Sequence, residues 1–206
     1  MLTLFYAPGS CALASHITLE ESGAAYESKR LNFAENEQRK PEYLKINPKS
    51  RVPALVTDQG TLTETPAILV HIAQIFPKAN LIPTKDPFLL AQIQSFNSYL
   101  CSTVHVAHAH RMRGYRWTDD APAMETMKRK VPQNVGDCFE LIESNYFKGP
   151  WVMGDTYTIS DPYLFTIASW LEADGVDPKR FPKVLDHRNR MAERPAVKKV
   201  LARETT

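Results

Sequence analysis

One short segment near the N-terminus has the residue types and spacing for thiol chemistry. The segment YAPGSC at residues 6–11 follows an apolar strand pattern at residues 2–6 and leads into a helical pattern at residues 11–22. Pro8 and Gly9 are turn residues, so Cys11 falls in the first turn of the helix. Unpaired N–H groups and the helix dipole favour an anion there. Cys11 is therefore a candidate for a reactive thiolate of lowered pKa, and the same place can hold the sulfur of a thiol ligand.

A second candidate for ligand binding is the pair Glu64-Thr65, between a predicted hairpin and a predicted helix. Both residue types are common at helix N-termini, so the pair can be no more than a helix cap. Alternatively, the N–H and hydroxyl of Thr65 can hold a carboxylate while Glu64 pairs with an ammonium group. In that case the two residues bind the head of an α-amino acid.

Histidines and aromatic residues mark the later, helical part of the chain. Cys101, His105 and His108 recur at helical spacing. A single helix rarely supplies a full set of metal ligands, so packing or the polar lining of a cleft between domains is favoured over a metal site. Three aromatic residues can line an apolar pocket or fill the core, and the sequence favours neither: Tyr115, Trp117 and Trp170.

The elements that must position these residues begin with a βαβ pattern. Strands are predicted at 2–6, 26–32, 52–57 and 61–63, helices at 11–22 and 65–76, and a short helix or turn at 39–46. A βαβ start implies parallel strands with a right-handed crossover, and the turn at residues 58–60 implies an antiparallel hairpin. This order is the thioredoxin-like arrangement. In such a domain we expect a cis Val52-Pro53 bond, with the backbone of Val52 turned towards the thiol site and able to pair with a peptide ligand.

A second domain of a different class follows. Prolines at 77, 83 and 87 mark a linker, and beyond it the strand signals vanish. We expect a thioredoxin-like α/β domain at 1–77, a linker at 78–87 and an all-helical domain at 88–206. Its helices are predicted at 88–116, 124–147, 158–172, 182–193 and after Pro195. Thr158 to Asp161 form a capping box that starts a buried helix, a structural role.

Composition narrows the functional class. The chain has 206 residues, a formal net charge of +2 and 43% hydrophobic residues, with no basic stripe typical of a nucleic-acid binder. Three widely spaced cysteines are a poor disulfide framework and favour a reducing compartment. The first 20 residues lack the pattern of a signal peptide, and no apolar run reaches the length of a membrane span. We expect a cytoplasmic protein.

Over essentially its whole length the sequence resembles the cytosolic glutathione transferases. The resemblance rests on four motifs in the family's order: YxPGSC at 6–11, NPxxxVP at 47–53, LTE at 62–64 and the capping box at 158–161. Each motif is weak alone, but the ordered set is specific. The PGSC segment together with Val104-His105 is most similar to the bacterial beta class, in which a cysteine faces the glutathione sulfur.

The resemblance implies a homodimeric transferase that conjugates glutathione to small apolar electrophiles in detoxification, without a metal. The implied catalytic residues are Cys11, His105, Ser10 and Tyr6. The implied glutathione-binding residues are Cys11, Val52, Pro53, Glu64, Thr65 and Arg39. The implied electrophile pocket is formed by Tyr115, Trp117 and Trp170. Within this set Val52 pairs with the cysteinyl backbone, Glu64 and Thr65 hold the γ-glutamyl end, and Arg39 meets the glycyl carboxylate.

Two other functions stay open on the same fold. One is a monothiol, glutathione-dependent oxidoreductase, because Ala14 stands where a Cys-x-x-Cys motif would have its second cysteine. The other is a non-catalytic binding protein that uses the fold as a scaffold.

Overall fold

The computed structural model describes residues 1–205 and consists of two compact units. The first unit combines Met1–Leu90 with the C-terminal segment Met191–Thr206, and the second is Ala91–Arg190. The sequence placed all of 88–206 in one helical domain, so the observed division differs at the C-terminal end. The difference arises because the last helix contacts the first unit.

The first unit is built on a four-stranded sheet. Its strands are β1 (Leu2–Tyr6), β2 (Tyr26–Arg30), β3 (Ala54–Thr57) and β4 (Gly60–Thr63), in the order β2-β1-β3-β4. β1 pairs in parallel with β2 and antiparallel with β3, which in turn forms the β3–β4 hairpin. The predicted βαβ start, the hairpin and the thioredoxin-like class are confirmed.

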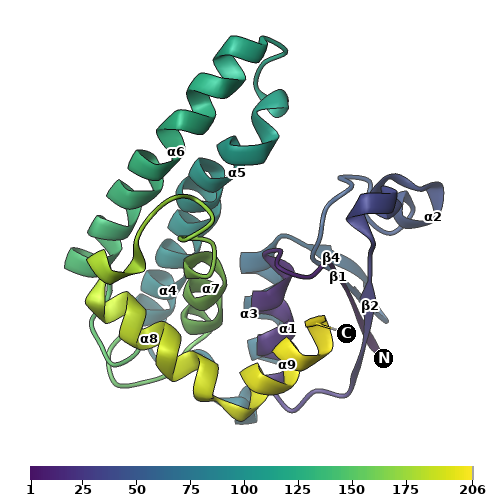
Figure 1. Ribbon diagram of the computed structural model, residues 1–206. Coiled ribbons are helices and arrows are strands. Elements are labelled where there is room, and N and C mark those ends of the chain that lie inside the picture. The colour runs from purple at the N-terminus through teal and green to yellow at the C-terminus, as the bar shows by residue number, and fades with distance from the viewer. Residues whose placement is uncertain (206) are drawn as a thin grey trace. The chain divides into compact units, whose positions relative to one another are not determined.

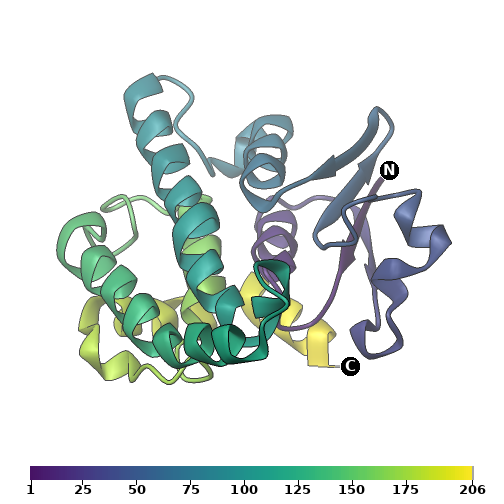
Figure 2. The same ribbon diagram turned by 90° about the horizontal axis from the view of Figure 1, so that it is seen from above.

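Helices lie on both sides of this sheet. α1 (Ala12–Glu21) and α3 (Thr65–Ile75) are on one side and α2 (Pro41–Leu44) is on the other (Figures 1 and 2). Leu4 of β1, Leu55 of β3 and the inner faces of α1 and α3 are fully buried between them. The core therefore holds the beginnings of α1 and α3 in fixed positions at the sheet.

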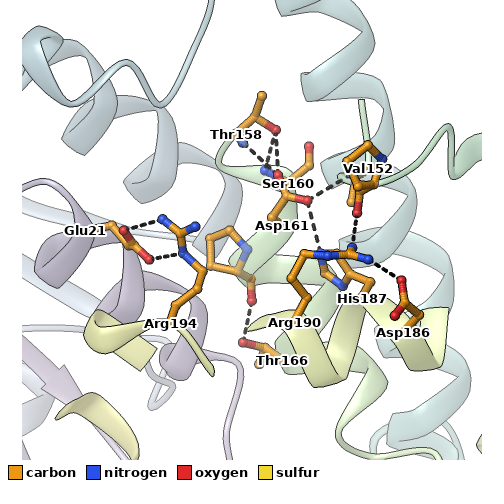
Figure 3. Close-up of polar contacts among 12 residues, drawn as sticks. Glu21, Val152, Thr158, Ser160, Asp161, Thr166, Asp186, His187, Arg190 and Arg194 are labelled. Carbon is orange, nitrogen blue, oxygen red and sulfur yellow. Dashed lines mark hydrogen bonds and ion pairs between the residues drawn. The ribbon is translucent and has the colours of Figure 1, made fainter. Parts of the chain in front are cut away.

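The C-terminal helix α9 (Pro195–Thr205) belongs to this first unit because it is tied to α1. Just before α9, Arg194 forms a two-pronged ion pair with Glu21, at 2.5 and 2.9 Å (Figure 3). Near its end, Glu204 lies 3.1 Å from Nδ1 of His16, and the His16 side chain is fully buried. No spacing pattern in the sequence predicts these charged contacts. The sequence-based prediction therefore assigned α9 to the helical domain.

The second unit is helical. It contains α5 (His105–Arg113), α6 (Ala121–Leu141) and α7 (Ser160–Ala168), and most of α4 (Pro87–Tyr99) and α8 (Pro182–Glu193). α5 and α6 run side by side as a hairpin (Figure 1). The helix expected at 88–116 is interrupted by a π-helical turn at Leu100–Val104, and α6 ends in another at Ile142–Tyr146. Within residues 1–205 no helix combines the length and apolar character that crossing a membrane requires.

The predicted capping box is the buried polar centre of the second unit. Asp161 accepts hydrogen bonds from the N–H of Thr158 at 2.7 Å and of Val152 at 2.9 Å, and Nε2 of His187 lies 3.0 Å away (Figure 3). Asp161 and His187 are both fully buried. The capping box therefore starts α7, as predicted, and also connects α7 to α8 and to the loop before it.

Candidate functional site

Cys11 lies at the N-terminal end of α1, at the N-cap position. The turn before it depends on Gly9, whose φ of +69° is in the left-handed region that glycine favours. Ser10 stabilises the turn, because its hydroxyl donates to the carbonyl of Ala7 at 2.6 Å and accepts from the N–H of Ala12 at 3.3 Å. These contacts make Ser10 a residue that orients the turn and thereby Cys11.

The backbone of Val52 is next to this cysteine. The Cys11 Sγ donates to the Val52 carbonyl oxygen at 3.4 Å, although 41 residues separate them in the chain. The Val52-Pro53 bond is cis, as expected. The structure thus brings together three of the residues that sequence reasoning selected, Cys11, Val52 and Pro53.

Two buried side chains form hydrogen bonds to the loop that carries Val52. The hydroxyl of Tyr43 and the side-chain amide of Asn47 both donate to the carbonyl of Arg51, at 2.6 and 2.7 Å. Burial raises the pKa of Tyr43 to about 12, so its hydroxyl remains protonated and donates. Both side chains are almost fully buried. Their contacts fix the backbone immediately before Val52.

Glu64 and Thr65 stand where β4 passes into α3. Glu64 has φ 73° and ψ 117°, an uncommon conformation for a residue with a side chain, and Thr65 begins the helix. Strained residues of this kind concentrate at functional sites. Lys49 Nζ lies 2.5 Å from the carboxylate of Glu64 and donates to the hydroxyl of Thr63 at 2.7 Å. Sequence reasoning missed Lys49, whose only signal was its place in the loop before Val52.

The two remaining candidates in the first unit have different surroundings. The ring of Tyr6 is buried and packs against His16 with ring centres 4.9 Å apart. Burial and the nearby Glu204 raise the pKa of Tyr6, so its hydroxyl stays protonated. Arg39 is exposed, in a short 3₁₀ turn. The hydroxyl of Ser50 donates to the carbonyl of Gln38 beside it at 2.7 Å, which ties the Arg39 turn to the loop that carries Val52.

The candidates on the helical unit fall into separate groups. His105 packs against Trp170, with ring centres 5.0 Å apart. Trp117 packs against His110 at 4.4 Å, and Tyr115 is about half exposed. Because Leu100–Val104 is a π-helical turn, Cys101 does not follow the α-helical register of His105. No cluster of three or more potential metal ligands occurs within residues 1–205.

Family models match both halves of the chain. The model of the Glutathione S-transferase N-terminal domain matches residues 1–74, and that of the Glutathione S-transferase C-terminal domain matches residues 107–204. The first match contains Cys11, Val52 and Glu64, and the second contains Trp117 and Trp170.

Similar proteins cover the whole chain. Glutathione S-transferase GstA of Escherichia coli O157:H7 is 31% identical over 98% of this chain and 98% of its own. A glutathione transferase homolog from Sulfitobacter, solved with bound glutathione, is 44% identical, covers 100% of this chain and 99% of its own, and superposes with a TM-score of 0.97. A bacterial beta class enzyme from Sphingomonas chungbukensis is 31% identical over 98% of both chains, with a TM-score of 0.86. The chain therefore belongs to the glutathione S-transferase family.

Proposed function

We propose that this protein conjugates glutathione to small electrophiles, with the glutathione sulfur at Cys11. The observation that carries the proposal is the approach of Cys11 Sγ to the Val52 carbonyl, 3.4 Å away at the start of α1. A thiol there meets the positive end of a helix dipole, and a peptide-like ligand has a backbone group of the protein beside it. We place this activity in the reducing cytoplasm, as part of detoxification.

We assign the remainder of glutathione to other residues of the first unit. The backbone of Val52 pairs with the cysteinyl residue of glutathione, beside Pro53. At the γ-glutamyl end, Glu64 binds the ammonium group and the start of α3 at Thr65 binds the carboxylate. The ammonium group replaces Lys49 on Glu64, which is feasible because both side chains of that ion pair are about half exposed. Arg39 is the cation for the glycyl carboxylate.

The reaction needs glutathione as a thiolate. The sulfur attacks the electrophilic carbon, a carbon–sulfur bond forms, and the leaving group departs with its electron pair, while the thiol proton passes to solvent. Lowering a thiol pKa by two units corresponds to about 2.7 kcal/mol. A helix N-terminus supplies about 0.3–1 kcal/mol at an exposed site. We propose that His105 supplies much of the remaining stabilisation of the thiolate. The Cys11 turn, held by Ser10, supplies the rest.

One set of assays separates this function from its two alternatives. Purified protein is tested for retention on immobilised glutathione, for conjugation of 1-chloro-2,4-dinitrobenzene and for glutathione-dependent reduction of a small disulfide. Retention with conjugation is the expected result. Disulfide exchange without conjugation would identify a monothiol oxidoreductase. A result of neither conjugation nor exchange would support the binding scaffold.

A further inference from the structure

The ion pair between Lys49 and Glu64 occupies the group that the proposed function assigns to the ammonium of glutathione. Nζ of Lys49 lies 2.5 Å from a carboxylate oxygen of Glu64 and donates to the hydroxyl of Thr63 at 2.7 Å. A lysine ammonium group carries three N–H donors, as the α-ammonium group of a γ-glutamyl residue does. Lys49 therefore supplies from within the chain the same chemical group that the ligand would bring.

The carboxylate of Glu64 is not engaged in capping the helix that follows it. Glu64 is the N-cap residue of α3, but its side chain makes no capping hydrogen bond within the part of the chain that the structure describes. The side chain is instead 56% exposed and contacts Lys49. The carboxylate is thus open to a cation, and Lys49 is the cation that the structure places on it.

The main chain of Lys49 is anchored close to Glu64, while its side chain reaches into solvent. The N–H of Lys49 donates to the side-chain oxygen of Asn47 at 3.1 Å, and Asn47 is almost fully buried. Beyond this anchor the side chain is a flexible four-carbon stem, and 47% of it is exposed. The ammonium group can therefore leave Glu64 for water without any change in the main chain.

The exposure of both partners limits the strength of this ion pair. Exposed pairs of this kind change an equilibrium constant by about two- to fivefold at most. A ligand with an ammonium group has to displace Lys49, so its binding is weakened by that factor. A ligand without one leaves Lys49 in place, and Lys49 then neutralises a carboxylate that would otherwise repel the anionic ligand.

We propose that Lys49 is a specificity-determining residue of the glutathione site, because its ammonium group competes with the ligand for Glu64. The inference rests on the proposed function, which assigns Glu64 to the γ-glutamyl ammonium group. Glutathione then binds less tightly than Glu64 alone would allow. The site also accepts ligands whose γ-acyl group lacks the ammonium group, which a bare Glu64 carboxylate would reject.

Isothermal titration calorimetry measures this preference directly. The ligands are S-methylglutathione, whose blocked sulfur cannot react with Cys11, and its glutaryl analogue, in which hydrogen replaces the α-ammonium group. The preference is the dissociation constant of the analogue divided by that of S-methylglutathione. Lys49→Met keeps an apolar stem and removes the charge, so we expect the preference to rise at least about threefold. An unchanged or lower preference overturns the inference.

A second pair of variants separates competition for Glu64 from a general effect of charge. Lys49→Met combined with Glu64→Gln removes the same positive charge, but no carboxylate is left to compete for. The preference of the double variant should therefore equal that of Glu64→Gln alone. A rise as large as in the wild-type background would show that Lys49 acts through its charge at a distance, and this also overturns the inference.

The control variant is Lys198→Met, in the C-terminal segment of the same unit. Lys198 forms an ion pair with Glu193 at the same distance of 2.5 Å, and its side chain is 56% exposed. The substitution should leave the preference at the wild-type value. If Lys198→Met raises it as much as Lys49→Met does, the effect is not specific to Glu64 and the inference fails.

The same titrations distinguish failure of the inference from failure of the proposed function. If wild type binds S-methylglutathione and Lys49→Met leaves the preference unchanged, Lys49 has no part in specificity while the glutathione site stands. If wild type binds neither ligand, the assignment of Glu64 to glutathione fails, and the inference fails with it.

Discussion

At the scale of single residues, Cys11 and Cys138 have different environments. Cys11 stands at the start of α1, where the helix dipole favours a negative sulfur. Cys138 lies within α6, where burial raises the pKa of its thiol, a shift that the hydrogen bond to Tyr99 only partly offsets. Because thiolates rather than thiols exchange with disulfides, the two sites should differ in reactivity at neutral pH.

We predict that oxidised glutathione forms a mixed disulfide at Cys11 and not at Cys138. The Cys11 thiolate attacks one sulfur of the disulfide, and one molecule of glutathione leaves as a thiolate. Intact-mass spectrometry at pH 7 should show one added glutathionyl group on wild type and on Cys138→Ala, and none on Cys11→Ala. An equal gain in mass for Cys11→Ala would show that the reactive thiol is elsewhere.

A second prediction concerns Glu64. Glu64→Gln should weaken glutathione binding by about 1.5–3 kcal/mol, because a charge-assisted hydrogen bond to the γ-glutamyl ammonium group is lost. Isothermal titration calorimetry measures the change, with Glu42→Gln on the exposed side of α2 as the control. Unchanged affinity in Glu64→Gln would leave the junction as a helix cap alone.

Sequence reasoning identified residues whose role depends on a local motif and missed those that act through a distant contact. Cys11 follows a turn that the sequence displays, so its place at the start of α1 could be predicted. Lys49 approaches Glu64 across 15 positions, and His108 meets Asp174 across 66 positions. Neither pair has a spacing rule, because side chains so far apart in sequence meet only once the whole unit has folded.

At the scale of elements, α9 is bound to the first unit by a charged cluster around Glu20. Glu20 lies at the end of α1 and accepts hydrogen bonds from Lys199 and Arg203 of α9 and from Tyr26 of β2. Burial raises the pKa of Glu20, but the hydrogen bonds from Lys199 and Tyr26 and the positive charges nearby outweigh it, so the pKa lies below its usual range. Folding and the ionisation of Glu20 are therefore coupled.

This coupling predicts a pH-dependent contribution of Glu20 to stability. Since its pKa is lower in the folded state, the contribution is complete above the unfolded-state pKa and is lost as the pH falls through the folded-state pKa. Urea unfolding followed by circular dichroism should show Glu20→Gln less stable than wild type by about 1 kcal/mol at pH 7. The difference should shrink as the pH is lowered.

The matched control for this measurement is Glu27→Gln, on an exposed position of β2. It should change the free energy of unfolding little at either pH. A difference for Glu20→Gln that stays constant from pH 7 down into the acid range would contradict the coupling.

The element order was predictable and the interruptions within elements were not. Alternating apolar strands, the turn at residues 58–60 and the proline linker are local signals, and the observed sheet follows them. The π-helical turns at Leu100–Val104 and Ile142–Tyr146 lie in sequences with normal helical periodicity. Their formation depends on packing inside the helical unit, which periodicity does not describe.

At the scale of the whole molecule, exposed apolar side chains bear on the assembly state. Large apolar side chains such as Phe88 and Met112 are more than 70% exposed in the single chain. Closed twofold dimers are the commonest soluble oligomers, and such side chains are suited to an interface.

We therefore predict a homodimer in solution. Light scattering at micromolar concentration should give twice the chain mass of 23.3 kDa. Phe88→Ser is the first variant to test for loss of the dimer, and Glu27→Gln serves again as an exposed control. A mass of one chain for wild type would refute the prediction.

Because the first unit is assembled from both ends of the chain, its biosynthesis cannot proceed domain by domain. Met1–Leu90 leaves the ribosome first, but Met191–Thr206 is made only after the whole of Ala91–Arg190. At typical translation rates this interval is about 5–20 s. Throughout it, the nascent α1 lacks the helix that supplies Glu204 to His16. Premature stop codons anywhere before Pro195 should therefore yield products that chaperones and proteases recognise, even when every predicted glutathione-binding residue has been translated.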